Sequence, residues 1–148
     1  MASDRKASKA PSPETLDALV RIVGEEHAIR DPREMERYLV EWRDRYRGKA
    51  ALVLKPGSTQ EVSAILEHAN RTGTSIVPQG GNTGLVGGQI PFESGNEIVV
   101  SLERMTHVRD IDLASNTMIV EAGIPLPKAQ QVAPAADRLF PPSLASEG

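Results

Sequence analysis

The hydrophobic residues near the start of the chain recur with the spacing of an amphipathic helix. Leu16, Leu19, Val20 and Val23 fall at i, i+3, i+4 and i+7, so they form one apolar stripe. Ser12 precedes this run as an N-cap, with proline at the first helical position and a glycine after the last apolar residue. The pattern predicts a capped helix that ends at this glycine.

A second, more charged segment begins at the Asp-Pro pair that follows. Tyr38, Leu39 and Trp42 would share one face if this segment is helical. We expect residues 12–47 to form an N-terminal helical segment. A polar, disordered leader over residues 1–11 is expected to precede it.

The pattern then changes to short apolar runs that are separated by turn residues. Residues 51–54 predict a buried strand, and the Ser58-x-x-Glu61 capping box begins a helix that a glycine ends. Residues 75–77 predict the next strand. A strand–helix–strand unit of this length normally pairs its strands in parallel.

The second half of the chain is dominated by strand patterns. Residues 98–102 predict a buried strand, and residues 107–112 and 117–121 predict a hairpin with a Leu-Ala-Ser-Asn turn. Residues 125–139 predict a helix that Pro134 would kink or end early. The sequence as a whole predicts an α+β fold in which helices flank a small mixed or parallel β-sheet.

Composition excludes several classes of function. The 148 residues are 39% hydrophobic, enough for one modest core, and the formal charge of −3 gives no electrostatic footprint for nucleic acid or anionic membranes. The chain has no cysteine, which excludes disulfides, thiolate metal sites and cysteine nucleophiles. No apolar run approaches the ~20 residues of a membrane span. The polar N-terminus lacks a secretory signal, so a cytoplasmic location is predicted.

Residues 80–88 have the most unusual composition, since they hold five of the chain's 12 glycines. Glycine loses the most backbone freedom on folding, so such a run usually serves positive φ angles or a close approach to the backbone. Successive N–H groups in such a loop can bind an anion such as a phosphate. We call residues 80–88 the glycine loop.

Two common nucleotide-binding motifs do not match this loop. A Rossmann fingerprint needs glycines that open a helix, and a Walker loop needs a lysine, which is absent between Lys55 and Lys128. Two interpretations stay open at this point. The loop is either a long turn, or a backbone-amide cradle for a nucleotide pyrophosphate that Asn82 and Thr83 assist.

Conventional catalytic and metal-binding motifs are missing, so neither a catalytic residue nor a metal site is predicted. His27 and His68 fall on predicted helix surfaces, and His107 has no evident partner. No zinc-binding spacing and no nucleophile elbow is present. Glu121 ends a predicted strand beside a glycine, where a ligand could approach, but a role in a strand-to-helix turn is favoured.

Residues 78–88, with the sequence PQGGNTGLVGG, closely resemble the first pyrophosphate-binding loop of FAD-linked oxidases of the vanillyl-alcohol-oxidase type. These enzymes share a PCMH-type FAD-binding domain. The branch with asparagine after the glycine pair contains D-2-hydroxyglutarate dehydrogenase, D-lactate dehydrogenase and the glycolate oxidase flavin subunit. Residues 53–63, 105–123 and 140–148 also resemble family segments in the same order, so the likeness covers roughly residues 38–148.

The resemblance implies the first of two α+β subdomains that clasp FAD, followed by a cap domain that holds the substrate. Non-covalent FAD is implied, because the loop lacks the histidine that some members use for a covalent link. Gln79 stands where many members carry an arginine that contacts phosphate. The cofactor-binding residues implied are Pro78, Gly80, Gly81, Asn82, Thr83, Gly84 and Leu85 around the pyrophosphate, and Pro141, Ala145, Ser146 and Gly148 in the second segment.

The activity implied is oxidation of a D-2-hydroxy acid (2-hydroxyglutarate, lactate or glycolate) to the keto acid, with hydride transfer to FAD and a separate electron acceptor. The family's second subdomain, cap and catalytic residues lie beyond the position that matches Gly148. We therefore expect residues 48–148 to be the first part of the FAD-binding domain, inactive alone. Two alternatives are a stand-alone flavin- or nucleotide-binding module or electron-transfer subunit, and a remnant whose glycine loop is only structural.

Overall fold

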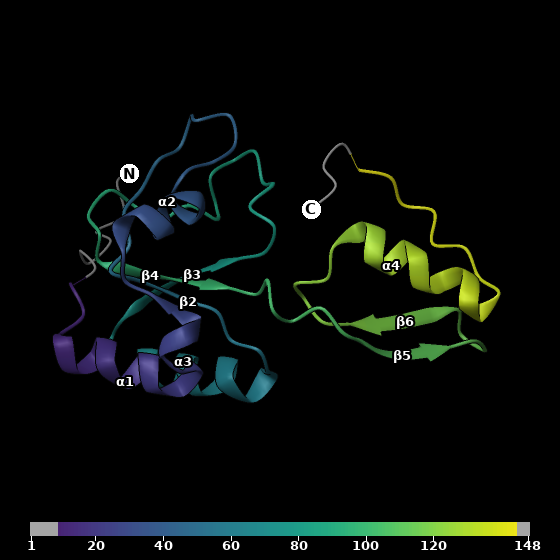
Figure 1. Cartoon of the computed structure of the whole chain (residues 1–148), viewed down its shortest axis with the longest axis horizontal. Helices are drawn as coiled ribbons and strands as arrows, with labels where there is room; N and C mark the ends of the chain where they lie inside the picture. The colour runs from purple at the N-terminus through teal and green to yellow at the C-terminus, as the bar shows by residue number, and fades with distance from the viewer. Residues whose placement is uncertain (1–8, 145–148) are drawn as a thin grey trace, which may run out of the picture.

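A four-stranded sheet forms the centre of the larger of two lobes (Figure 1). The computed structural model describes residues 9–144, and most of the predicted leader lies outside them. The strand order is β1 (Ala28–Ile29), β2 (Leu52–Leu54), β4 (Glu97–Ser101), β3 (Ser75–Gln79). The last three strands are parallel to one another, and β1 is antiparallel to β2.

Helices cover both faces of this sheet. α1 (Pro13–Val23) and α3 (Thr59–Thr72) lie on one face and α2 (Pro32–Leu39) on the other, while a short 3-10 turn, η1 (Glu25–His27), leads from α1 into β1 (Figure 1). Alternate strand residues point to opposite faces. One core therefore contains Leu52, Leu54, Ile98 and Val100 with α1 and α3, and the other contains Val53, Val77 and Val99 with α2.

The predicted helix caps are confirmed. The Ser12 hydroxyl accepts a hydrogen bond from the Thr15 N–H at 3.3 Å, and the Ser58 hydroxyl accepts one from the Glu61 N–H at 3.1 Å. The Glu61 carboxylate reaches back to the Gly57 N–H at 2.7 Å. These contacts satisfy N–H groups that have no partner inside a helix.

Two expectations about the larger lobe are wrong. α2 ends at Leu39, and Trp42 is 70% exposed, so Trp42 does not share its buried face. The chain leaves the helix because Val40 takes an extended conformation and pairs with Arg47. In addition, β4 lies between β2 and β3, so the strands of the predicted strand–helix–strand unit are parallel but not adjacent.

The smaller lobe consists of the predicted hairpin and one helix. β5 (Val108–Asp112) pairs antiparallel with β6 (Thr117–Val120), and α4 (Leu126–Val132) lies beside them (Figure 1). As predicted, the α-helix stops before Pro134, and a 3-10 turn, η2 (Ala133–Ala136), continues it.

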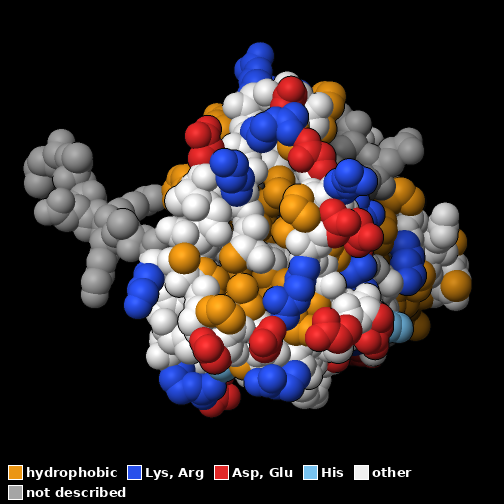
Figure 2. Space-filling view, turned by 60° about the vertical axis from the view of Figure 1, so that its left-hand side comes forward, with side chains coloured by type: hydrophobic (Ala, Val, Ile, Leu, Met, Phe, Trp, Pro, Cys, Tyr) orange, Lys and Arg blue, Asp and Glu red, His pale blue; other side chains and the backbone are white. Residues whose placement is uncertain are grey.

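The parallel strands of the larger lobe end on the side that faces the smaller lobe (Figure 1). The space-filling view in Figure 2 brings forward the other end of the larger lobe. There, Lys and Arg side chains are interspersed with Asp and Glu around a patch of hydrophobic side chains. No basic stripe typical of nucleic-acid binding runs across this face. Among the helices of residues 9–144, none has the length and apolar character needed to cross a membrane.

Candidate flavin-binding site

A cavity of about 510 Å³ lies between the glycine loop, the end of β4 and the smaller lobe. Gly80, Gly81 and Thr83 line it from the loop, and Glu103 lines it from the turn after β4. Apolar side chains of the smaller lobe and the segment after it form much of the remaining wall, among them Met118, Val120, Ile124, Leu126, Phe140 and Leu144. Ligands of open α/β sheets bind at the carboxyl ends of the strands, which is where this cavity lies.

The glycine loop leaves its backbone open to the cavity at Gly80. A Cβ added to Gly80 would meet no atom within 4 Å, so packing within the chain does not require glycine there. Gly87 is different, because its φ is 74° and a Cβ would lie 2.7 Å from the Tyr46 ring. Gly87 thus shapes the loop, whereas Gly80 presents bare backbone to a cavity.

Asn82 anchors the loop to the carboxyl end of α2. Its side-chain amide donates to the Arg37 carbonyl at 3.1 Å and to the Val40 carbonyl at 2.9 Å, and its φ of 55° lies in the left-handed region. The Oδ1 atom is buried without a hydrogen-bond partner in the chain. The amide N–H groups of Asn82 are therefore used within the protein, and Asn82 is not among the residues that line the cavity.

The Gln79 side chain is buried at the base of the glycine loop and bonds to the backbone carbonyl directly after the loop. Only 2% of the residue is exposed, and its amide donates to the Tyr38 carbonyl at 2.9 Å and the Gln89 carbonyl at 3.0 Å. Gln89 in turn donates to the Gly84 carbonyl at 2.7 Å. Where the resemblance implies an arginine that contacts phosphate, this chain has a buried amide that holds the two ends of the loop together.

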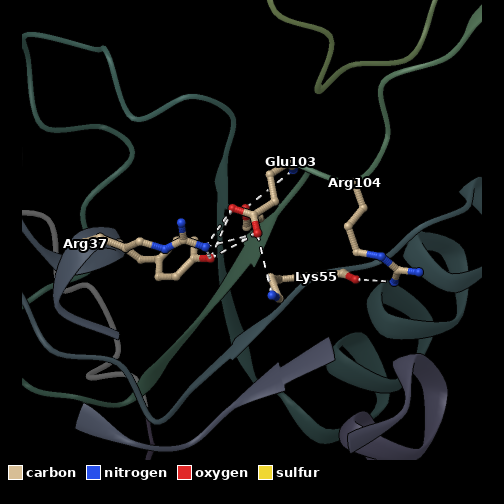
Figure 3. Close-up of polar contacts among 6 residues, drawn as sticks. Arg37, Lys55, Glu103 and Arg104 are labelled. Carbon is tan, nitrogen blue, oxygen red and sulfur yellow. Dashed lines mark hydrogen bonds and ion pairs between the residues drawn. The ribbon is translucent and has the colours of Figure 1, made fainter. Parts of the chain in front are cut away.

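Glu103 lies at the centre of a polar cluster on the cavity wall (Figure 3). Its carboxylate accepts from the Arg37 guanidinium at 3.2 and 3.3 Å and from the Tyr38 hydroxyl at 3.1 and 3.2 Å, and Lys55 Nζ lies 3.6 Å away. Arg104 donates to the Lys55 carbonyl at 2.7 Å. Burial raises the pKa of Tyr38, and the negative charge of Glu103 raises it further, so the hydroxyl stays protonated.

Glu121 and Gly123 have structural partners that fit the predicted turn. The Glu121 carboxylate accepts from the His107 N–H and from its Nδ1, both at 2.9 Å, and from Arg109 at 3.2 Å. The His107 backbone and ring contacts, followed by Arg109, lower the pKa of Glu121 to about 2. A Cβ on Gly123 would lie 1.8 Å from the Leu102 carbonyl oxygen, so the backbone of the smaller lobe packs directly on the end of β4.

The structure brings together only part of the predicted cofactor site. Pro78, Gly84, Leu85 and Pro141 are exposed and lie outside the cavity lining. From the second segment, the structure instead places Phe140 and Leu144 against the cavity, while Ala145, Ser146 and Gly148 lie outside the described residues.

Sequence reasoning missed Glu103 and the apolar wall. The alternation along the hairpin could have indicated Met118 and Val120, which are two residues apart on one strand and so point to the same face. Among residues 9–144, no group of three or more His, Asp or Glu side chains is placed to hold a metal ion.

Comparison with known proteins identifies the family of this chain. The model of a family described as the FAD binding domain matches residues 50–148, two thirds of the chain. This chain belongs to the FAD-binding domain family.

This chain is similar to two curated relatives and to one solved structure. This chain is 41% identical over 115 residues to the D-2-hydroxyglutarate–pyruvate transhydrogenase of Saccharomyces cerevisiae, covering 78% of this chain and 23% of that protein. It is 39% identical over 102 residues to the mitochondrial D-2-hydroxyglutarate dehydrogenase of Arabidopsis thaliana, covering 69% and 18%. The chain thus spans about a fifth of the length of these relatives.

The fold matches that of a solved alkyldihydroxyacetonephosphate synthase with a TM-score of 0.74 at 20% identity, over 88% of this chain and 26% of that one. The predicted α+β architecture, with a small mixed sheet flanked by helices, is confirmed. The lining of the cavity suits FAD, because bare glycine backbone can approach a pyrophosphate and apolar side chains can pack against a flat ring system.

Proposed function

We propose that this chain holds FAD for a flavin-dependent oxidoreductase that oxidises a D-2-hydroxy acid, such as D-2-hydroxyglutarate, to the 2-keto acid. The observation that carries the proposal is the bare backbone of the glycine loop, which lines one cavity together with the apolar wall of the smaller lobe. The names of the relatives at 39–41% identity support the substrate class.

FAD, when bound, supplies two-electron oxidation chemistry by accepting a hydride. The residues of this chain bind and orient the cofactor. Gly80, Gly81 and Thr83 offer backbone N–H groups and a hydroxyl to the pyrophosphate, while Asn82 and Gln79 fix the shape of the loop. The apolar side chains opposite the loop keep water from one side of the cavity.

FAD is proposed to be bound without a covalent link. The chain contains no cysteine, and none of its three histidines is among the described residues that line the cavity. Acid precipitation of the holoprotein tests this directly. All of the flavin should appear in the supernatant, and yellow colour retained in the protein pellet would contradict the proposal.

The activity is tested on the complete protein purified from its source and loaded with FAD. It is mixed with D-2-hydroxyglutarate, D-lactate or glycolate and an electron-accepting dye, and reduction of the dye is followed. We expect reduction with D-2-hydroxyglutarate and none with its L enantiomer. Bound FAD without turnover of any hydroxy acid would favour a stand-alone flavin-binding module instead.

A cytoplasmic location stays a prediction, which fractionation of the source cells would test.

A further inference from the structure

Glu103 is the single charged side chain among the described residues that line the cavity. Its side chain is 35% exposed, so the carboxylate can reach solvent or a ligand on one side while its protein partners hold the other. Figure 3 shows Arg37, from the end of α2, and Lys55, directly after β2, beside the carboxylate. The Tyr38 hydroxyl donates to it as well. The cluster orients Glu103 without enclosing it.

The same two residues of α2 position both Glu103 and the glycine loop. The side chains of Arg37 and Tyr38 donate to the Glu103 carboxylate. Their backbone carbonyls accept the amides of Asn82 and Gln79, respectively. The end of a single helix thereby fixes where the carboxylate lies relative to the bare loop backbone, as a preorganised binding site requires.

The charge and hydrogen-bonding capacity of Glu103 limit what it can bind. A carboxylate only accepts hydrogen bonds, and its two oxygens offer about four lone-pair sites. A phosphate placed against it would be repelled, whereas a hydroxyl group would donate to it. FAD carries hydroxyl groups on both sides of its pyrophosphate: on the ribose of its adenosine and on the ribityl chain.

We propose that Glu103 accepts a hydrogen bond from a sugar hydroxyl of FAD next to the pyrophosphate. This assignment rests on the proposed function. It uses the chemistry by which a carboxylate holds a ribose in dinucleotide-binding folds of other architecture. Glu103 is then a cofactor-positioning residue that selects for the hydroxylated dinucleotide, and the Arg37–Tyr38 pair sets its geometry.

The test measures the affinity of the FAD-free chain for three probes by quenching of flavin fluorescence. They are FAD, an analogue with 2′,3′-dideoxyribose in the adenosine, and an analogue whose ribityl chain lacks its hydroxyls. The wild type should bind one of the two analogues about 10- to 100-fold more weakly than FAD, as expected for loss of a hydrogen bond to a charged group. Which analogue is weakened identifies the sugar.

Glu103→Gln should bind FAD about 10-fold more weakly and should discriminate less between FAD and that analogue than the wild type does, because its amide oxygen can accept only a neutral hydrogen bond from the same hydroxyl. Asp17→Asn is the control, since Asp17 pairs with Arg30 and is not among the residues that line the cavity. It should keep the wild-type discrimination.

Three outcomes would overturn the assignment. The first is equal affinity of the wild type for FAD and both analogues, which decides the question even if Glu103→Gln fails to fold. The second is full discrimination in a folded Glu103→Gln variant. The third, no FAD binding by the wild type, would overturn the proposed function as well, so the two failures are distinguishable.

Discussion

Asn82 is predicted to hold the glycine loop on α2 through two hydrogen bonds and a left-handed backbone. Asn82→Ala removes both bonds, to the Arg37 and Val40 carbonyls, at about 1 kcal/mol each. It also places alanine at a φ of 55°, which costs about 1 kcal/mol more. The substitution also removes Oδ1, whose burial without a hydrogen-bond partner is unfavourable, and this offsets part of the loss of stability. We expect the free energy of unfolding to fall by about 2–3 kcal/mol.

Asn82→Gly is the matched control, because glycine tolerates the left-handed conformation but makes neither bond. Urea denaturation, followed by circular dichroism, should rank the proteins as wild type, Asn82→Gly and Asn82→Ala, with about 1 kcal/mol between the two variants. A free energy of unfolding of Asn82→Ala within about 0.5 kcal/mol of the wild-type value would refute the stabilising role of the two Asn82 hydrogen bonds. A glycine variant less stable than the alanine variant would refute the backbone argument.

Two further predictions concern the smaller lobe. Gly123→Ala should destabilise the protein by more than about 3 kcal/mol, because the new Cβ would lie 1.8 Å from the Leu102 carbonyl oxygen; Gly88→Ala, in open space, should change stability by less than about 1 kcal/mol in the same thermal melts. Glu121 has its pKa lowered from 4.5 to about 2 in the folded protein, so its stabilising effect is complete above pH 4.5 and is lost as the pH falls towards 2. Urea titrations at several pH values should therefore show a steeper acid loss of stability in the wild type than in Glu121→Gln, and parallel pH profiles would contradict the assigned contacts.

The sequence predicted the elements whose causes are local. The Ser58 capping box, the hairpin and the end of the helix before Pro134 each depend on residues within a few positions, and the structure contains all three. The end of α2 was not predictable, because it depends on the pairing of Val40 with Arg47 and not on a helix-breaking residue. The insertion of β4 between its neighbours likewise depends on the whole sheet.

The candidate site was predictable only in part for the same reason. The glycine loop is a local motif, whose composition left a long turn and a backbone cradle both open until the family resemblance favoured the cradle. Glu103 had no such signal, because its partner Arg37 lies 66 residues earlier in the chain and only the fold brings them together. The inward turn of Gln79 is also a property of tertiary structure, since its acceptors include the Tyr38 carbonyl of α2.

FAD is proposed to occupy the cavity beside the bare backbone of Gly80, and one titration tests this most directly. A Cβ at either Gly80 or Gly88 would meet no atom of the chain within 4 Å. Gly80→Leu adds its side chain beside the cavity, whereas Gly88→Leu adds it at a residue that does not line the cavity. With FAD added to the folded proteins, we expect saturable one-to-one binding to the wild type and to Gly88→Leu. Gly80→Leu should bind at least about 10-fold more weakly, a loss of about 1.4 kcal/mol. Equal affinity of Gly80→Leu and the wild type, or no binding to either, would contradict the account.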